Sequence, residues 1–129
     1  MRSKAKKKSF KIKFYENLIK ERPYFFNVLV CLRQEYRKRG FYEESLEITK
    51  RLVKLKPSDP VVHYNLACSL SLLGKIDEAF LELKKAIILG YDDFFCILKD
   101  PDLENLRKDN RFKDFLDKLK NLKNVKEQT

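Results

Sequence analysis

The side chains best suited to catalysis or metal binding are few and widely separated in this 129-residue chain. It contains one histidine, His63, and three cysteines, Cys31, Cys68 and Cys96, with no CxxC pair. A zinc site needs about four thiolate or imidazole ligands at close spacing, and a disulfide framework needs an even set of cysteines. We therefore expect free cysteines that pack as small, buried or half-buried apolar side chains, and a histidine with a structural role.

Acidic side chains form one run near the C-terminal end, at Asp100, Asp102, Glu104 and Asp109. Basic residues are interleaved among them, and the run lacks the glycine and the ligand spacing of an EF-hand calcium loop. We expect a solvated surface with local ion pairs. Since the three glycines are spread along the chain, no glycine-rich phosphate-binding loop can form. The sequence offers no catalytic residue, no cofactor and no metal site, and we expect a protein that is not an enzyme.

Positive charge is concentrated at the N-terminus. The formal net charge is +10, and residues 1–22 hold nine Lys/Arg against two Glu. Clustered cations neutralise phosphates, so this segment is chemically able to bind nucleic acid or an anionic lipid surface. The candidate polyanion-binding residues are Lys4, Lys6, Lys7, Lys8, Lys11 and Lys13. A solubilising leader explains the composition at least as well, and residues 1–9 are expected to be disordered because they have no apolar face.

The elements that position these side chains follow a 34-residue period. Gly40 and Gly74 lie 34 positions apart, and Gly40 is expected to close a helix in a left-handed conformation. Apolar periodicity predicts helices over 10–22, 24–39, 42–56, 60–73 and 77–89. Asp59 is expected to cap the fourth of them, with Pro60 at its first position. Beyond Gly90 the period fails, and we expect shorter helices over 92–99, 101–107 and 110–122, then a frayed tail at 123–129.

The block at 60–93 resembles the tetratricopeptide repeat (TPR), and the block at 26–59 is similar to it. The TPR signature is W-x2-L-G-x2-Y, then A-x3-F, then P, within about 34 residues. The second block reads His63-x2-Leu66-Ala67-x2-Leu70, then Ala79-x3-Leu83, with Tyr91 at the proline position. The first reads Leu29-x2-Leu32-Arg33-x2-Tyr36, then Ser45-x3-Thr49, then Pro57. The tail after Gly90 resembles the ending of small bacterial-type TPR proteins.

The resemblance implies an all-α fold, a right-handed α-solenoid of antiparallel helix pairs. One domain would span residues 10–122, with a half repeat at 10–22, full repeats at 26–59 and 60–93, and a helical cap at 94–122. It also implies a scaffold that binds peptides in a groove lined by the leading helices. The groove-facing residues would be Asn27, Val30, Gln34, Arg37, Lys38, Val61, Tyr64, Cys68, Ser71 and Leu72.

This groove has a basic polar half and a more apolar half, which suits a short acidic peptide with apolar anchors, since Arg can pair a carboxylate in a bidentate way. The TPR subclass that grips C-terminal carboxylates is a poor match, because Val30 and Gln34 replace the expected Lys and Asn. The main functional expectation is a non-enzymatic adaptor that binds a peptide or protein partner. The alternatives are the polyanion binder and a self-associating structural module that uses the apolar end of helix 10–22.

Location is inferred from what the sequence lacks. No apolar run reaches the ~20 residues that span a bilayer, and the basic start lacks the apolar segment of a secretory signal. Unpaired cysteines suit a reducing compartment. We expect a cytoplasmic protein, with the identity of its partner and its oligomeric state left open.

Overall fold

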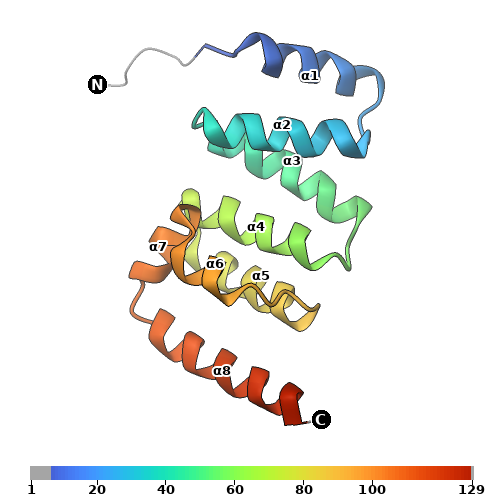
Figure 1. The fold of residues 1–129 in the computed structure, drawn as a ribbon. Helices are drawn as coiled ribbons and strands as arrows, with labels where there is room; N and C mark the ends of the chain where they lie inside the picture. Colours follow the sequence, from blue (N-terminus) through green and yellow to red (C-terminus); the bar gives the residue numbers. More distant parts are fainter. Residues whose placement is uncertain (1–6, 129) are drawn as a thin grey trace, which may run out of the picture.

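The computed structural model describes the backbone of residues 7–128 and the side chains of residues 7–121, and all structural statements refer to these residues. Their regular secondary structure is entirely helical (Figure 1), which confirms the expected all-α class. The elements are α1 (Phe10–Glu21), α2 (Phe26–Lys38), α3 (Tyr42–Leu55), α4 (Pro60–Leu72), α5 (Ile76–Ile88), α6 (Phe94–Lys99), the 3-10 helix η1 (Pro101–Leu103), α7 (Glu104–Lys108) and α8 (Phe112–Gln128).

The 34-residue period is visible in the helix bounds, because α2 and α4 begin at positions 26 and 60, and α3 and α5 at positions 42 and 76. Gly40 and Gly74 both have left-handed backbones, with φ of 80° and 74°. At each glycine the following residue donates its N–H back into the preceding helix, from Phe41 to the Tyr36 carbonyl and from Lys75 to the Leu70 carbonyl. Identical turn chemistry therefore produces identical reversals of the chain.

The start of α4 follows the expected capping chemistry. The Asp59 carboxylate accepts hydrogen bonds from the N–H groups of Val61 and Val62, at 2.8 and 3.3 Å, and Pro60 is the first helical residue. These contacts satisfy amides that have no partner inside the helix. The start of the second helix pair is thus fixed by two consecutive residues, Asp59 and Pro60.

Consecutive helices from α1 to α5 pack as neighbours in a stack. Two apolar clusters hold it together. The first joins α1, α2 and α3 through buried Ile12, Leu29, Leu32, Ile48 and Leu52, and reaches Val62 at the start of α4. The second joins α4 and α5 to the C-terminal segments through Ala67, Leu70, Leu83, Ile97, Leu103, Leu106 and Leu119. Fully buried Ala67, Ala79 and Ala86 keep α4 and α5 close together.

The C-terminal helix is longer than expected. The sequence predicts a helix over 110–122 and a frayed tail, whereas α8 begins at Phe112 and continues to Gln128. Residues 123–128 contain neither glycine nor proline, and their Lys, Glu and Gln are good helix formers, so the helix has no local signal to stop. The start is later than expected because Asp109 accepts the N–H of Arg111 in a turn that precedes the helix.

Candidate interaction surface on the leading helices

We define the leading-helix surface as the ten residues expected to line the groove, five on α2 and five on α4. The structure divides them by exposure. On α2, Asn27, Val30 and Lys38 are exposed, and Gln34 and Arg37 are half-buried. On α4, Val61 is exposed and Leu72 half-buried, but three residues are almost completely covered, namely Tyr64, Cys68 and Ser71, at 5, 3 and 0% exposure.

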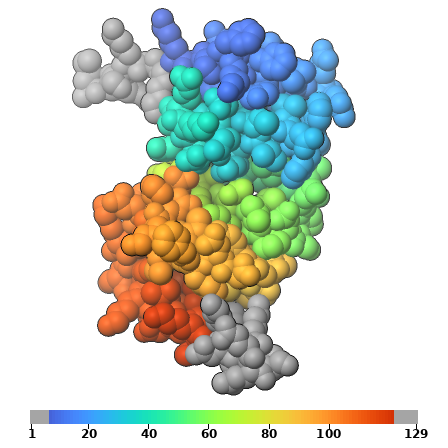
Figure 2. Space-filling view, in the orientation of Figure 1, coloured from blue at the N-terminus to red at the C-terminus, as the bar shows by residue number. Residues whose placement is uncertain are grey.

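The cover over α4 is the chain's own C-terminal segment at residues 100–106, which we call the covering segment. Its backbone N–H at Leu106 donates to the Ser71 hydroxyl at 3.2 Å, and the Asn105 amide donates to the Ser71 carbonyl at 2.9 Å. Leu103 and Leu106 are fully buried against the second cluster. In Figure 2 the orange and yellow C-terminal atoms lie over the green part of the chain, while the blue and cyan helices are uncovered in this view.

Asp100 anchors the start of the covering segment. Its carboxylate accepts a 2.6 Å hydrogen bond from the Tyr64 hydroxyl, and the Cys68 and Cys96 thiols lie 3.8 and 3.7 Å from the same oxygen. The Tyr64 ring stacks on Tyr91, with centroids 4.2 Å apart. Burial, the neighbouring Cys68 and the hydrogen bond to Asp100 raise the pKa of Tyr64, so its hydroxyl stays a neutral donor.

Burial also raises the pKa of the Cys68 thiol well above its ordinary value, with further contributions from Asp100 and Asp102. Nucleophilic and metal-binding cysteines need a thiolate, which this environment disfavours. The Cys68 position on the leading-helix surface therefore holds a protonated thiol that packs against the covering segment.

A second acidic residue of the covering segment faces α2. The Asp102 carboxylate lies 3.4 Å from the Arg37 guanidinium, and both side chains are largely buried. Burial raises the pKa of Asp102, and the charge of Arg37 opposes that rise. Burial and the charge of Arg37 lower the pKa of the neighbouring Arg33, and Cys68, Asp102 and Asp100 oppose this. One arginine of α2, Arg37, is thus ion-paired with a carboxylate of the covering segment, Asp102.

The sequence-based expectation for the acidic run is therefore wrong for Asp100 and Asp102. They bind α4 and α2 rather than solvent, because the chain turns at Pro101 and places them against the leading helices. Glu104 does form a local pair, with Lys108 at 3.4 Å. Asp109 binds Arg111 at 2.8 Å, which lowers the Asp109 pKa to about 2.

An uncovered stripe remains on α2, formed by Asn27, Val30, Cys31, Gln34 and Lys38, which we call the α2 stripe. Val30 is 41% exposed, and Cys31 is exposed as well. The expectation that all three cysteines are buried or half-buried is wrong for Cys31. Its spacing of four residues from Asn27 places it on the outer side of the helix, opposite the buried Val28, Leu29 and Leu32.

The N-terminal face of the stack exposes two aromatic rings. Phe10 and Phe14 on α1 are 84 and 50% exposed, and their centroids lie 6.3 Å apart. Lys7, Lys11 and Lys13 are exposed beside them, while Lys8 pairs with Glu16 at 2.8 Å. Lys4 and Lys6, and with them the disorder expected for the start of the leader, lie outside the described residues.

His63 is a buried structural link rather than a surface group. Its Nδ1 lies 2.8 Å from the Glu82 carboxylate and its Nε2 lies 2.6 Å from the Pro57 carbonyl, so one ring joins α4 to α5 and to the preceding turn. Sequence spacing offers no sign of Glu82, which is 19 positions away. Within residues 7–121 no group of three or more His, Cys, Asp or Glu side chains is arranged to hold a metal ion.

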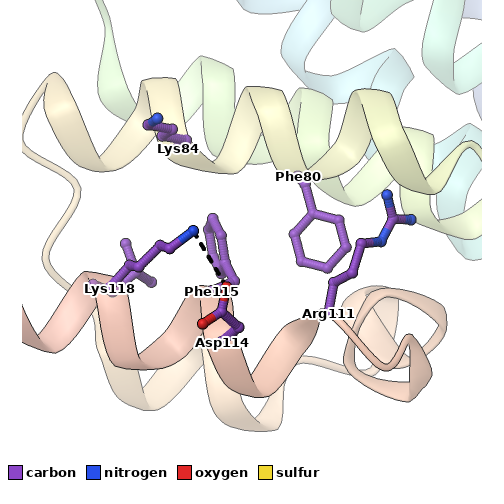
Figure 3. Close-up of a pocket in the computed structure, with 7 residues that line it drawn as sticks. Phe80, Lys84, Arg111, Asp114, Phe115 and Lys118 are labelled. Carbon is purple, nitrogen blue, oxygen red and sulfur yellow. Dashed lines mark ion pairs between the residues drawn. The ribbon is translucent and has the colours of Figure 1, made fainter.

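A cleft of about 450 Å³ lies at the C-terminal end of the stack, between α5 and α8 (Figure 3). Its apolar lining is Phe80 from α5 together with Phe115 and Leu119 from α8, and its charged lining is Lys84, Arg111, Asp114 and Lys118. No sequence pattern indicates this cleft, because it depends on how the last helix packs against α5.

Comparison with known proteins gives a partial relationship. No family model matches the chain. Over 81 residues it is 40% identical to a protein of Arabidopsis thaliana that is named as chloroplastic. The aligned region covers 60% of this chain but 24% of that protein, so the relative is much longer than the part it shares. The similarity thus extends to one segment of the relative.

None of the helices in the described part of the chain combines the length and the apolar character needed to cross a bilayer.

Proposed function

We propose that the helix pairs form a right-handed, TPR-like α-solenoid and that the chain is a non-enzymatic module that binds a peptide or protein partner. The 34-residue shift between the bounds of α2 and α4, and between the glycine turns that follow them, supports the repeat assignment. Repeats of this size stack to expose one extended face, which is the part of such proteins that binds partners.

The observation that carries the proposal is the covering segment. Residues 100–106 are an acidic stretch with two apolar anchors, Leu103 and Leu106, and they bind the leading helices through Arg37, Tyr64 and Ser71. An acidic peptide with apolar anchors is the ligand that the sequence suggested for this surface. The leading-helix surface therefore has the chemistry to hold such a peptide, and part of it already does so within the chain.

The partner would bind where the surface is uncovered, on the α2 stripe. Asn27 and Gln34 offer amide groups to a peptide backbone, Val30 offers an apolar contact, and Lys38 offers a cation at one end. The covering segment lies directly beside this stripe, since Asp102 contacts Arg37. A bound peptide would thus extend from α2 toward the acidic edge of the covering segment.

Substitution of Val30 tests the proposal. Immobilised protein carrying Val30→Lys should lose capture of its partner from native lysate, because a lysine replaces the central apolar contact. The matched control is Leu81→Lys, at a 55% exposed position on α5. Circular dichroism should be unchanged for both variants. Equal capture by the wild type and Val30→Lys would contradict binding on the α2 stripe.

A second candidate function is the polyanion binder, and the N-terminal face favours it. Lys11 lies 34 positions before Ser45 and 68 before Ala79, which are 1 and 0% exposed and pack closely against neighbouring helices. Lys11 at this position opposes the close approach of another helix to α1. Together with the exposed Phe10 and Phe14, Lys11 would instead contact nucleic-acid phosphates or an anionic lipid surface.

Salt dependence separates this candidate from the adaptor. Binding to anionic vesicles or to single-stranded DNA should fall steeply between low and moderate salt, and should be lost in Lys11→Glu/Lys13→Glu. Binding that is independent of salt would remove this candidate. The self-associating module also stays a prediction, and a mass that rises with concentration in sedimentation would support it.

The compartment is likewise a proposal. The sequence predicts the cytoplasm, whereas the name of the Arabidopsis relative places that protein in the chloroplast. Fractionation of cells that express a tagged form of this chain would decide between the two compartments.

A further inference from the structure

The cleft between α5 and α8 is a consequence of the break in the repeat. In the preceding repeat, Leu46 of α3 has the position that corresponds to Phe80 of α5, and Leu46 is 7% exposed. After α5 the chain crosses to the leading-helix surface, so the covering segment leaves this side of α5 open. Phe80 is therefore only half-buried, and one side of its ring packs against Phe115 of α8, with the two centroids 5.1 Å apart.

One wall of the cleft carries a group of ion pairs centred on Arg111. The Arg111 guanidinium lies 5.1 Å from the centre of the Phe80 ring and bridges Asp77 at 2.6 Å and Asp109 at 2.8 Å. These hydrogen bonds raise the pKa of Arg111 and occupy its donors. Arg111 thus lies over the Phe80 ring, and its charge is already balanced by two carboxylates.

Two lysines can meet an anion at the cleft, one without an ion-pair partner and one in an exposed pair. Lys84 is exposed and has no ion-pair partner among the described side chains. Lys118 pairs with Asp114 at 3.2 Å, with both side chains about three-quarters exposed, and such surface pairs exchange readily for another anion. Figure 3 shows Lys84 on α5 and Lys118 on α8, with the two phenylalanine rings in the gap between the helices.

We propose that this cleft binds a small amphipathic anion, with an aromatic ring or short acyl chain beside Phe80 and Phe115 and a carboxylate or sulfonate head near Lys84 and Lys118. The volume supports a small molecule, since such sites in proteins occupy roughly 300–1,000 Å³ and combine apolar walls with few polar groups. The anion follows from Lys84, the one cation of the lining without an ion-pair partner among the described side chains, and from the exposed Lys118–Asp114 pair across the cleft. The site is separate from the α2 stripe and independent of the function proposed there.

The test uses two dyes of the same shape, anilinonaphthalene sulfonate and the uncharged phenylnaphthylamine, in fluorescence titrations of the full chain. We expect saturable binding of one sulfonate per chain, roughly tenfold tighter than the neutral dye. The variant Lys84→Glu/Lys118→Glu should weaken the sulfonate by about tenfold or more and leave the neutral dye unchanged. Amide chemical shifts should change in α5 and α8.

The matched control is Lys50→Glu/Lys113→Glu. Lys50 is exposed at the position of α3 that corresponds to Lys84, and Lys113 is an exposed lysine of α8 outside the cleft. This variant has the same net charge as the first and should bind the sulfonate as the wild type does. Equal affinity for the two dyes, equal weakening by both variants, shift changes centred on Phe10 and Phe14, or no saturable binding would each overturn the proposal.

Discussion

The two helix pairs have the same architecture, but the leading helix is exposed in the first pair and covered in the second. In the first pair the outer side of α2 is open, with Val30 41% exposed, whereas in the second pair Tyr64, Cys68 and Ser71 of α4 are buried under residues 100–106. The glycine turns and helix bounds repeat at the same spacing, so the difference does not come from the repeat itself. It comes from the chain after Gly90, which covers this side of α4 and leaves the α2 stripe exposed.

The largest expected effect tests how tightly the covering segment packs on α4. Leu106 is fully buried, so Leu106→Ala should lower the free energy of unfolding by about 2–5 kcal/mol through lost burial and a residual cavity. Leu98→Ala, at a 42% exposed position on α6, should cost less than about 1 kcal/mol. Urea denaturation followed by circular dichroism measures both. Similar costs would show that the segment does not pack as described.

The polar anchor of the covering segment should have a smaller effect. Tyr64→Phe removes the hydroxyl that donates to Asp100 and leaves a half-buried carboxylate with weaker partners, at a cost of about 1–3 kcal/mol. Tyr24→Phe is the control, because Tyr24 is 50% exposed in the turn between α1 and α2 and should change stability by less than about 0.5 kcal/mol. An unchanged free energy of unfolding in Tyr64→Phe would mean that Asp100 does not anchor the covering segment.

Acid should affect the two regions in opposite directions. Burial tends to raise the pKa of Glu16, but hydrogen bonds from Lys8 and Tyr36 outweigh it and lower that pKa. The stabilisation from Glu16 is therefore present above the ordinary pKa of about 4.5 and is lost as the pH falls through the lowered value. The pKa of Asp102 is raised, so protonation favours the folded state, and stability from this group is lost as the pH rises through the folded pKa.

Native-state hydrogen exchange near pH 4 and near neutrality measures this difference, after correction for intrinsic exchange rates. Protection at the α1–α2 contact should fall on acidification relative to protection at α4 and the covering segment. Asp102→Asn should abolish the pH response of the covering segment and leave that of α1 intact. A uniform loss of protection in both regions would contradict the assignment.

The smallest effect on stability is expected for a substitution in the α2 stripe. Val30→Ala removes an exposed methyl pair from α2 and should change stability by less than about 0.5 kcal/mol, since little apolar area is lost. The same change should weaken partner capture, because the removed contact is made only in the complex. A larger loss of stability would show that Val30 packs within the chain and is not available to a partner.

The sequence predicted what depends on neighbours along the chain. The positions of α1 to α5, the glycine turns and the Asp59 cap rest on contacts within a few residues, and the structure reproduces them. The covering segment could not be predicted, because Tyr64 and Asp100 lie 36 positions apart and meet only after the chain turns at Pro101. The exposure of Cys31 could have been found from its spacing to Asn27, but the cysteine's apolar character suggested burial instead.

The central claim is that α4 is covered by the chain itself while α2 is open, and each helix carries one cysteine that reports on it. Thiol labelling of the native protein with a maleimide, resolved by peptide mass spectrometry, should modify Cys31 quickly. Cys68 should react at least about a hundredfold more slowly, because labelling requires the covering segment to open. A bound partner should protect Cys31. Labelling of Cys68 at the rate of Cys31 would contradict the account.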